Sequence, residues 1–497
     1  MKKKAAFLLA ALTLLTGCGS SPVSGSDSTI APDSSDVPEE HKDDTVITIA
    51  SVHGIWEPMQ KLIDEFNARD NGIRVEVKNY AEEEDFKDFG IDEKGVFNGY
   101  DTDELKMIDF RVTQDLLNKD TIDLVGQFSF GNAAKYEIFK QRGGFCDLYE
   151  FMKDDPEVNP DTLSKHILEL NERDGKLYSM PAYYAAWSMT GKSGYVGTER
   201  NWTVSEFIDR WEKMPEGATV NGTNVAENIY YDVLRTNTTA FVDYVNCEVH
   251  FDSPDFRRML EFCSAFPSNM GQKSEHDYND VRFVQVAPIF NYKSAIASEM
   301  NYAEHKSEYY RLRDGSHTLV GFPTSDRRGA YLCSTHLELS ICANISAEKQ
   351  QAAWKFLREL YTEQFQTDSF ADRIESRNPQ TGETSVQYVL LLGFPINNAA
   401  RANIAEGFIN GSYENTNTII PEDEYAQDSD LRLEQADIDF IDEYISSIDR
   451  WEFQSTDREL FSIVEDEVLA YLHGEQDIDS TIDLIQNRAS IWISEQS

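Results

Sequence analysis

The sequence predicts an α/β protein with two domains or lobes, and three observations lead to this prediction. The chain has 497 residues, which is more than one hydrophobic core usually organises. Its residues are 40% apolar and 12% aromatic, enough to bury large cores. Strand patterns and helix patterns alternate through the first part of the chain, as they do in a parallel sheet covered by helices.

Five segments make up this first alternating series. Apolar residues at every second position predict strands at 45–50 and 73–80. Between them, apolar residues at three- and four-residue steps predict a helix over 56–72. A second helix is expected over 102–118, and a third strand over 122–128. The order strand, helix, strand, helix, strand is typical of a parallel sheet.

Later segments carry clear signals for helix starts. Thr203 and Glu206 have the spacing of a capping box, and Ser346 precedes a long amphipathic pattern that it is expected to cap. The chain ends in two predicted helices, one over 458–473 and one that starts at Ser480. This part of the chain therefore forms a second series of elements.

The N-terminus has the features of a bacterial lipoprotein signal. Three lysines precede an apolar run over 5–15 that is too short to span a bilayer, and the run ends in Leu-Thr-Gly-Cys. We expect a signal peptide over 1–17, lipidation of Cys18, and a flexible tether over 18–44 that is rich in Ser, Asp, Pro and Gly. A diacylglyceryl group carries the two acyl chains that a stable anchor needs. The alternative is an ordinary secretory cleavage site with an incidental cysteine.

Charge and missing motifs exclude several classes of function. The 88 acidic against 45 basic residues give a formal charge of -43, which repels nucleic acid and anionic lipid headgroups. The chain lacks a phosphate-binding loop, a dinucleotide fingerprint, an EF-hand loop and a G-x-S-x-G elbow. Cys333 and His336 have metal-like spacing but no second pair. We therefore expect no cofactor, no metal and no enzymatic activity.

A series of motifs gives the chain a family resemblance. In order, these are "ITIASVHGIWEPMQKLIDEFNAR", "DTIDLVGQFSF", "RDGKLYSMPAYYAAWSMTGKS", "WTVSEFIDRWEKM", "SICANISAEKQQAAWKFLREL", "GFPINNAAR" and "EDEVLAYLHGEQDIDSTIDLIQNRASIWISE". Together they resemble the extracellular solute-binding proteins of ABC importers, in the large sugar-binding family that includes maltose-binding protein. Thr121 stands where the family usually has a proline.

The resemblance implies a fold and a division of the chain. It implies a two-lobe, periplasmic-binding-protein-like fold of type II, with crossover strands between the lobes and a ligand cleft between them. By this analogy lobe 1 holds 45–165 plus 318–400. Lobe 2 holds 166–317 plus 401–497.

Candidate ligand-binding residues are aromatic or polar and follow the ends of strands. A sugar offers weakly apolar faces to rings and hydroxyl edges to polar groups, and rings are ordered at low entropy cost. Each ring has an alternative place in the core, and Trp56 fits the apolar face of its own helix equally well. The candidates are Trp56, Phe128, Ser129, Tyr183, Tyr184, Trp187 and Tyr331.

The resemblance also implies a role. We expect a monomer on the extracellular face of the bacterial cytoplasmic membrane, anchored only by lipid, that captures an oligosaccharide and delivers it to ABC permease subunits. Three alternatives stay open: a non-sugar solute on the same fold, a sensor partner of a membrane kinase, and a surface glycosidase. The number of rings does not encode the identity of a sugar.

Overall fold

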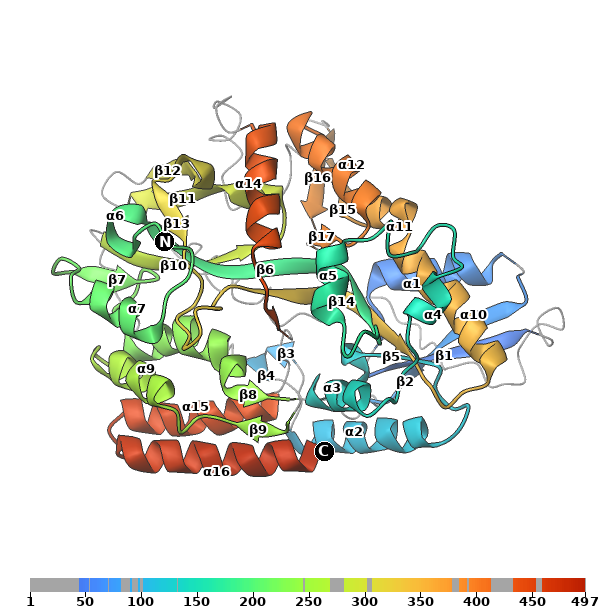
Figure 1. Ribbon diagram of the computed structural model, residues 1–497, viewed down its shortest axis with the longest axis horizontal. Coiled ribbons are helices and arrows are strands. Elements are labelled where there is room, and N and C mark those ends of the chain that lie inside the picture. Colours follow the sequence, from blue (N-terminus) through green and yellow to red (C-terminus); the bar gives the residue numbers. More distant parts are fainter. Residues whose placement is uncertain are drawn as a thin grey trace.

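The computed structural model describes most of the chain from Asp44 to Gln496. Figure 1 shows one long mixed sheet that crosses the molecule, with helices packed around it. The predicted signal peptide, Cys18 and the tether up to residue 43 lie outside the described residues. So do residues 53, 70, 82–89, 92–96, 99–101, 132, 245, 269–280, 302–305, 378–383, 391–392, 413–431, 453–457 and 497.

Parallel strands near the N-terminus form the start of the sheet. β1 (Thr45–Ser51) pairs in parallel with β2 (Ile73–Asn79) along its whole length. It also pairs in parallel with β5 (Leu124–Gly126). α1 (Glu57–Asn67) connects β1 to β2 and buries the apolar face that its residue spacing predicts. The predicted strand–helix–strand unit is therefore confirmed, with a helix shorter than its pattern suggests.

Two long strands continue the sheet toward its other end. β6 (Met180–Lys192) and β14 (Tyr331–Ile341) pair in an antiparallel ladder that sets Tyr331 opposite Trp187. β14 also pairs antiparallel with β5, so the order of strands is β2-β1-β5-β14-β6. A strand from late in the chain is thus inserted between β5 and β6. This arrangement confirms the predicted two-lobe α/β fold with crossover strands.

Shorter strands extend the sheet at the far end of β6. β10 (Val281–Ile289) pairs antiparallel with β6 and in parallel with β7 (Ala218–Val220). β13 (His317–Leu319) joins the same end of β6. β17 (Phe394–Pro395) pairs with β6 and β18 (Trp451–Glu452) with β14.

The helices gather in three places along the sheet (Figure 1). Beside β1 and β2, in addition to α1, lie α2 (Thr102–Leu117), α3 (Ala133–Gln141), α4 (Tyr149–Met152) and α10 (Ala347–Leu357). Beside β7 and β10 lie α6 (Ser193–Val196), α7 (Val204–Trp211), α9 (Pro254–Ser264), α15 (Arg458–Leu472) and α16 (Ile478–Gln496). Near the middle of β6 lie α5 (Lys165–Asn171), α11 (Glu363–Asp368), α12 (Asn398–Ile409) and α14 (Gln435–Ser446).

Short elements complete the fold. The hairpins are β3 (Gly90–Ile91) with β4 (Phe97–Asn98), β8 (Val242–Asp243) with β9 (Glu248–Val249), β11 (Ile296–Asn301) with β12 (Lys306–Arg311), and β15 (Ala371–Arg377) with β16 (Thr384–Leu390). The short helices are η4 (Gln127–Ser129), α8 (Ala226–Ile229), η5 (Tyr230–Leu234), η6 (Arg235–Phe241), η7 (Tyr292–Ala295), η8 (Leu312–Asp314) and η9 (Arg358–Tyr361). η5 is a π-helix.

The predicted helix caps are confirmed, and one predicted helix start is corrected. Thr203 and Glu206 form the expected capping box at α7, and the Ser346 hydroxyl accepts a hydrogen bond from an amide in the first turn of α10. α16 begins at Ile478, earlier than the predicted start at Ser480. The reason is that Asp477 acts as the cap: its carboxylate accepts from the Ser480 backbone amide at 2.9 Å.

Two buried apolar clusters are present among the described residues. The first packs around β1, β5, the first half of β6, α1 and α10, and continues beneath α12 and α14. The second packs around β7, β10, the far end of β6, α7, α9, α15 and α16. The predicted boundaries at 165/166, 317/318 and 400/401 stay predictions. Buried residues over 404–448 pack in the first cluster, whereas those over 460–493 pack in the second.

A buried ionic network joins α3 to both crossover strands. The Lys140 amine lies 2.5 Å from the Glu137 carboxylate and 3.0 Å from the Glu338 carboxylate on β14, and it donates to the Ser179 hydroxyl just before β6. Arg173 also pairs with Glu137. Burial opposes a charged amine, but the two carboxylates outweigh this effect and raise the pKa of Lys140. The network therefore fixes α3 to β6 and β14.

Removing Lys140 tests this network. Lys140→Met leaves the carboxylates of Glu137 and Glu338 buried without their shared cation, so we expect a loss of about 3–5 kcal/mol in the free energy of unfolding. Urea denaturation followed by circular dichroism measures this change. The control is Lys153→Met, because Lys153 forms an exposed pair with Glu150 and such pairs add little to stability. Equal losses in the two variants would contradict a structural role for the network.

Candidate functional site

Two of the predicted rings meet where the crossover strands pair. Trp187 on β6 and Tyr331 on β14 are direct partners in register, and their rings stack with centroids 6.4 Å apart. Both side chains are buried, at 5% and 7% exposure. The Phe290 ring meets Trp187 edge-on at 6.1 Å. The structure thus brings these two predicted rings together inside the second cluster, and their role in ligand binding stays a prediction.

Tyr331 connects the crossover strands to segments of the second cluster. Its hydroxyl donates to the Thr236 carbonyl at 3.4 Å, and its ring lies against Phe322 with centroids 5.9 Å apart. The Arg450 guanidinium lies 5.5 Å from the same ring. Burial raises the pKa of the Tyr331 hydroxyl far above its ordinary value, so this group is neutral. Tyr331 therefore acts here as a neutral packing and hydrogen-bonding side chain.

The other two rings of the same stretch lie deep in the first cluster. Tyr183 and Tyr184 are both 0% exposed. The Tyr183 hydroxyl donates to the Gln366 carbonyl at 2.8 Å. Tyr184 packs against Phe394, with ring centroids 5.9 Å apart, and under the Arg401 guanidinium at 5.6 Å. The sequence left open whether these two tyrosines lie in the core or in the ligand site, and the structure places both in the core. No part of either ring is accessible to a solute in this conformation.

The remaining candidates lie on two adjoining loops of the first lobe. Trp56 precedes α1 and Phe128 lies in η4 after β5, and both side chains are partly exposed. The two loops are joined by a hydrogen bond from the Val52 amide to the Phe128 carbonyl at 3.0 Å. Ser129 is fully buried and ties η4 to β1, because its hydroxyl donates to the Ala50 carbonyl. Trp56 and Phe128 are thus the predicted rings with surface open to a ligand, and their role in binding stays a prediction.

Asp232 is a perturbed acid that the sequence did not single out. It lies in the π-helix η5, a rare element that is frequent at functional sites, and η5 leads directly into η6, which contacts Tyr331. Burial raises the pKa of Asp232 to about 6, although a hydrogen bond from the Asn221 side-chain amide at 2.9 Å acts in the opposite direction. Among 88 acidic residues, no sequence signal distinguishes it. Acids perturbed in this way are candidates for functional sites.

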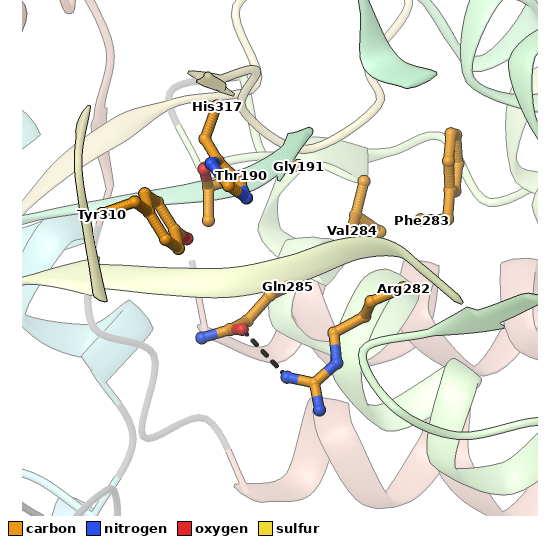
Figure 2. Close-up of a pocket in the computed structure, with 8 residues that line it drawn as sticks. All are labelled: Thr190, Gly191, Arg282, Phe283, Val284, Gln285, Tyr310 and His317. Atoms are coloured by element: carbon orange, nitrogen blue, oxygen red, sulfur yellow. Dashed lines mark hydrogen bonds between the residues drawn. The ribbon is translucent and has the colours of Figure 1, made fainter. Parts of the chain in front are cut away.

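A small pocket lies beside the far end of β6 (Figure 2). Its cavity volume is about 10 Å³, and it lies between β6, β10, β12 and β13. Tyr310 and His317 stack face to face with ring centroids 3.5 Å apart. Figure 2 shows these rings on one side of the β10 ribbon, with Arg282 and Gln285 on the other. Because ligand pockets usually enclose about 300–1,000 Å³, this pocket is too small for an oligosaccharide.

Two further kinds of feature are absent from the residues that the structure describes. Among them, no group of three or more His, Cys, Asp or Glu side chains is arranged to hold a metal ion. No helix in the described part of the chain combines the length and the apolar character needed to cross a bilayer.

No family model matches the chain, and no curated protein matches it in sequence. Solved structures with a similar fold do exist. The oligogalacturonide-binding protein of Yersinia enterocolitica is 12% identical, with 91% of this chain and 100% of that chain covered at a TM-score of 0.49. An extracellular solute-binding protein of family 1 from Alicyclobacillus acidocaldarius is 12% identical, with 91% and 99% covered at 0.47.

A third solved structure is the ABC substrate-binding protein of Listeria monocytogenes in complex with cycloalternan. It is 12% identical, with 91% of this chain and 99% of that chain covered at a TM-score of 0.45. These structures are of the kind that the sequence resemblance names. At this identity and these TM-scores, the likeness says nothing of what this chain binds.

Neutralising Asp232 tests its raised pKa. A carboxyl with a raised pKa adds most to stability below its unfolded value, near pH 4, and this contribution is lost as the pH rises through about 6. Asp232→Asn should therefore leave stability near pH 4 unchanged and raise it at pH 7.5 by up to about 3 kcal/mol. Urea denaturation at both pH values measures the difference. A gain that is the same at both pH values, or equal to that of the exposed control Glu65→Gln, would rule out a raised pKa.

Proposed function

We propose that this protein captures a carbohydrate, in particular an oligosaccharide, between its two lobes. The observation that carries the proposal is the pair of crossover strands. β6 and β14 contribute side chains to both buried clusters, so the lobes are separate packing units connected by strands that can bend. A solute that contacts both lobes favours the arrangement in which they close on it, by its differential affinity for that arrangement.

Chemistry near the crossover strands supports a carbohydrate as the solute. Trp56 and Phe128 present partly exposed rings on the first lobe, and flat rings suit the weakly apolar faces of sugars. Basic groups nearby are engaged by acids: Lys140 by Glu137 and Glu338, and Arg450 by Glu452. Because these cations are already paired, they are poorly placed to bind an anion. Together with the exposed rings, this favours an uncharged, hydroxyl-rich solute.

We further propose where the protein acts and with which partner. The apolar run and the Leu-Thr-Gly-Cys motif support lipidation at Cys18 and a place on the extracellular face of the bacterial cytoplasmic membrane. A tether over 18–44 then holds the lobes near the membrane, with an r.m.s. reach of roughly 30 Å. This placement suits delivery of the captured solute to an ABC permease, without any chemical change to it.

A panel of glycans tests the proposed function. The purified protein should gain thermal stability with at least one neutral oligosaccharide, because a ligand that binds only the folded state stabilises it by mass action. Isothermal titration calorimetry should then give a micromolar dissociation constant, corresponding to about -8 kcal/mol. No shift with any glycan of a broad panel, together with a shift for a non-sugar solute, would sink the carbohydrate proposal. Release of cleavage products from the glycans would contradict a purely binding role.

Two ring variants separate a role in binding from a role in the core. Phe128→Ala should weaken binding of the identified glycan by at least about tenfold, or 1.4 kcal/mol, and keep most of the stability. Tyr183→Ala should lower the free energy of unfolding by about 3–5 kcal/mol, because it removes a fully buried ring. Calorimetry and urea denaturation give the two quantities. Unchanged glycan affinity in Phe128→Ala would remove this ring from the site.

A further inference from the structure

One helix of the first lobe, α3, contacts the second lobe at both of its ends. Within α3, Tyr136 is buried in the first cluster, whereas Ala134 is buried in the second. At the other end of α3, the Gln141 side-chain amide donates to the Tyr244 carbonyl at 2.9 Å, and Tyr244 belongs to the second cluster. Both ends of α3 therefore contact the lobe to which the helix does not belong.

The main contact between the lobes joins Lys135, near the start of α3, to the last turn of α16. The Lys135 amine donates to the Glu495 carbonyl at 3.1 Å and to the Gln496 carbonyl at 3.3 Å. These carbonyls are in the last turn of α16, where backbone oxygens have no partner within the helix and where the helix dipole favours a cation. Figure 1 shows the C-terminal end of α16 beneath α3 and beside the start of α2. Lys135 thus links the two lobes by binding the C-terminal carbonyls of α16.

A second lysine of the first lobe strengthens the same junction. The Lys106 amine on α2 lies 2.6 Å from the Glu459 carboxylate at the start of α15. Burial lowers the pKa of Lys135, whereas the carboxyl groups of Asp109, Glu495 and Glu459 act to raise it. In a chain with a formal charge of -43, the lobes repel each other overall, so these lysines supply local attraction across the junction.

The end of α3 near Lys140 is fixed to the first lobe, so α3 cannot follow the second lobe when the lobes separate. Lys140 holds the helix to Glu338 on β14 and to Ser179 before β6 through the buried network described above. An opening motion that moves α16 away from the first lobe must therefore break the bonds from Lys135 and Gln141, because α3 stays with the crossover strands. Such a motion would break the contacts of Lys135 and Gln141 together.

We propose that α3 and the last turn of α16 form a latch that holds the two lobes together before a ligand arrives. The proposal rests on the proposed function, in that the lobes are taken to open and close around a solute. A latch of this kind raises the fraction of ligand-free protein that is already closed. The apparent affinity for a ligand rises with that fraction.

Small-angle scattering of the ligand-free protein tests the latch without a ligand. Lys135→Met, which keeps the apolar stem but removes the donor, should increase the radius of gyration relative to the wild type. Lys135→Arg should restore the wild-type value, because it keeps a cation at the end of α16. The matched control is Lys165→Met, since Lys165 is 84% exposed and pairs with Glu169 at 3.3 Å within its own helix, α5. The tether is common to all four proteins, so it does not affect the comparison.

The outcomes separate the latch from the proposed function. With a glycan that binds, Lys135→Met should show about a two- to fivefold weaker affinity, the range expected for one polar contact. A wild-type radius of gyration in Lys135→Met, with circular dichroism confirming its fold, would overturn the latch even if the glycan still binds. If no glycan binds but Lys135→Met is more extended, the latch stands and the ligand assignment fails.

Discussion

The antiparallel ladder between β6 and β14 is the constraint on which the rest of the structure depends. These two strands belong to both lobes, and their register sets Trp187 directly opposite Tyr331. Because every ladder bond would have to break for the lobes to part, the lobes can only bend and twist about these strands. The segment through α14 and β18, where β18 pairs with β14, adds a third connection. Any movement that exposes a cleft must therefore keep the ladder intact and change the contacts around it.

Charge is distributed to match this architecture. The chain is strongly acidic, yet the buried Lys140 and the partly buried Arg401 lie where segments far apart in sequence meet. Lys140 pairs with Glu338, which lies 198 positions further along the chain. Arg401 donates to both the Tyr292 hydroxyl and the Asp442 carboxylate. Buried pairs of this kind are costly to break and add less to net stability than their geometry suggests, so their main effect is to fix one arrangement of the elements. Lys135 differs, because it connects lobes that the proposed function requires to move.

Features that depend on residues close together in the sequence could be predicted, whereas those that depend on contacts between distant segments could not. The capping box at Thr203, the cap at Ser346 and the face of α1 depend on spacings of three or four residues, which the sequence displays directly. Which rings remain accessible depends on pairing between distant strands. Tyr183 lies in the first cluster, where its hydroxyl donates to Gln366 of α11, whereas Trp187 lies in the second cluster, where its ring stacks with Tyr331. Asp232 was hidden because one acid among many carries no signal until its burial is known.

The proposed ligand capture depends on both lobes together, and a structure of the protein with a bound glycan tests this most directly. The predicted result is a sugar held between the lobes, touching Trp56 or Phe128 on one side and residues of the second cluster on the other, with β6 and β14 still paired. A sugar bound to one lobe alone, with no contact to the other, would contradict the central claim.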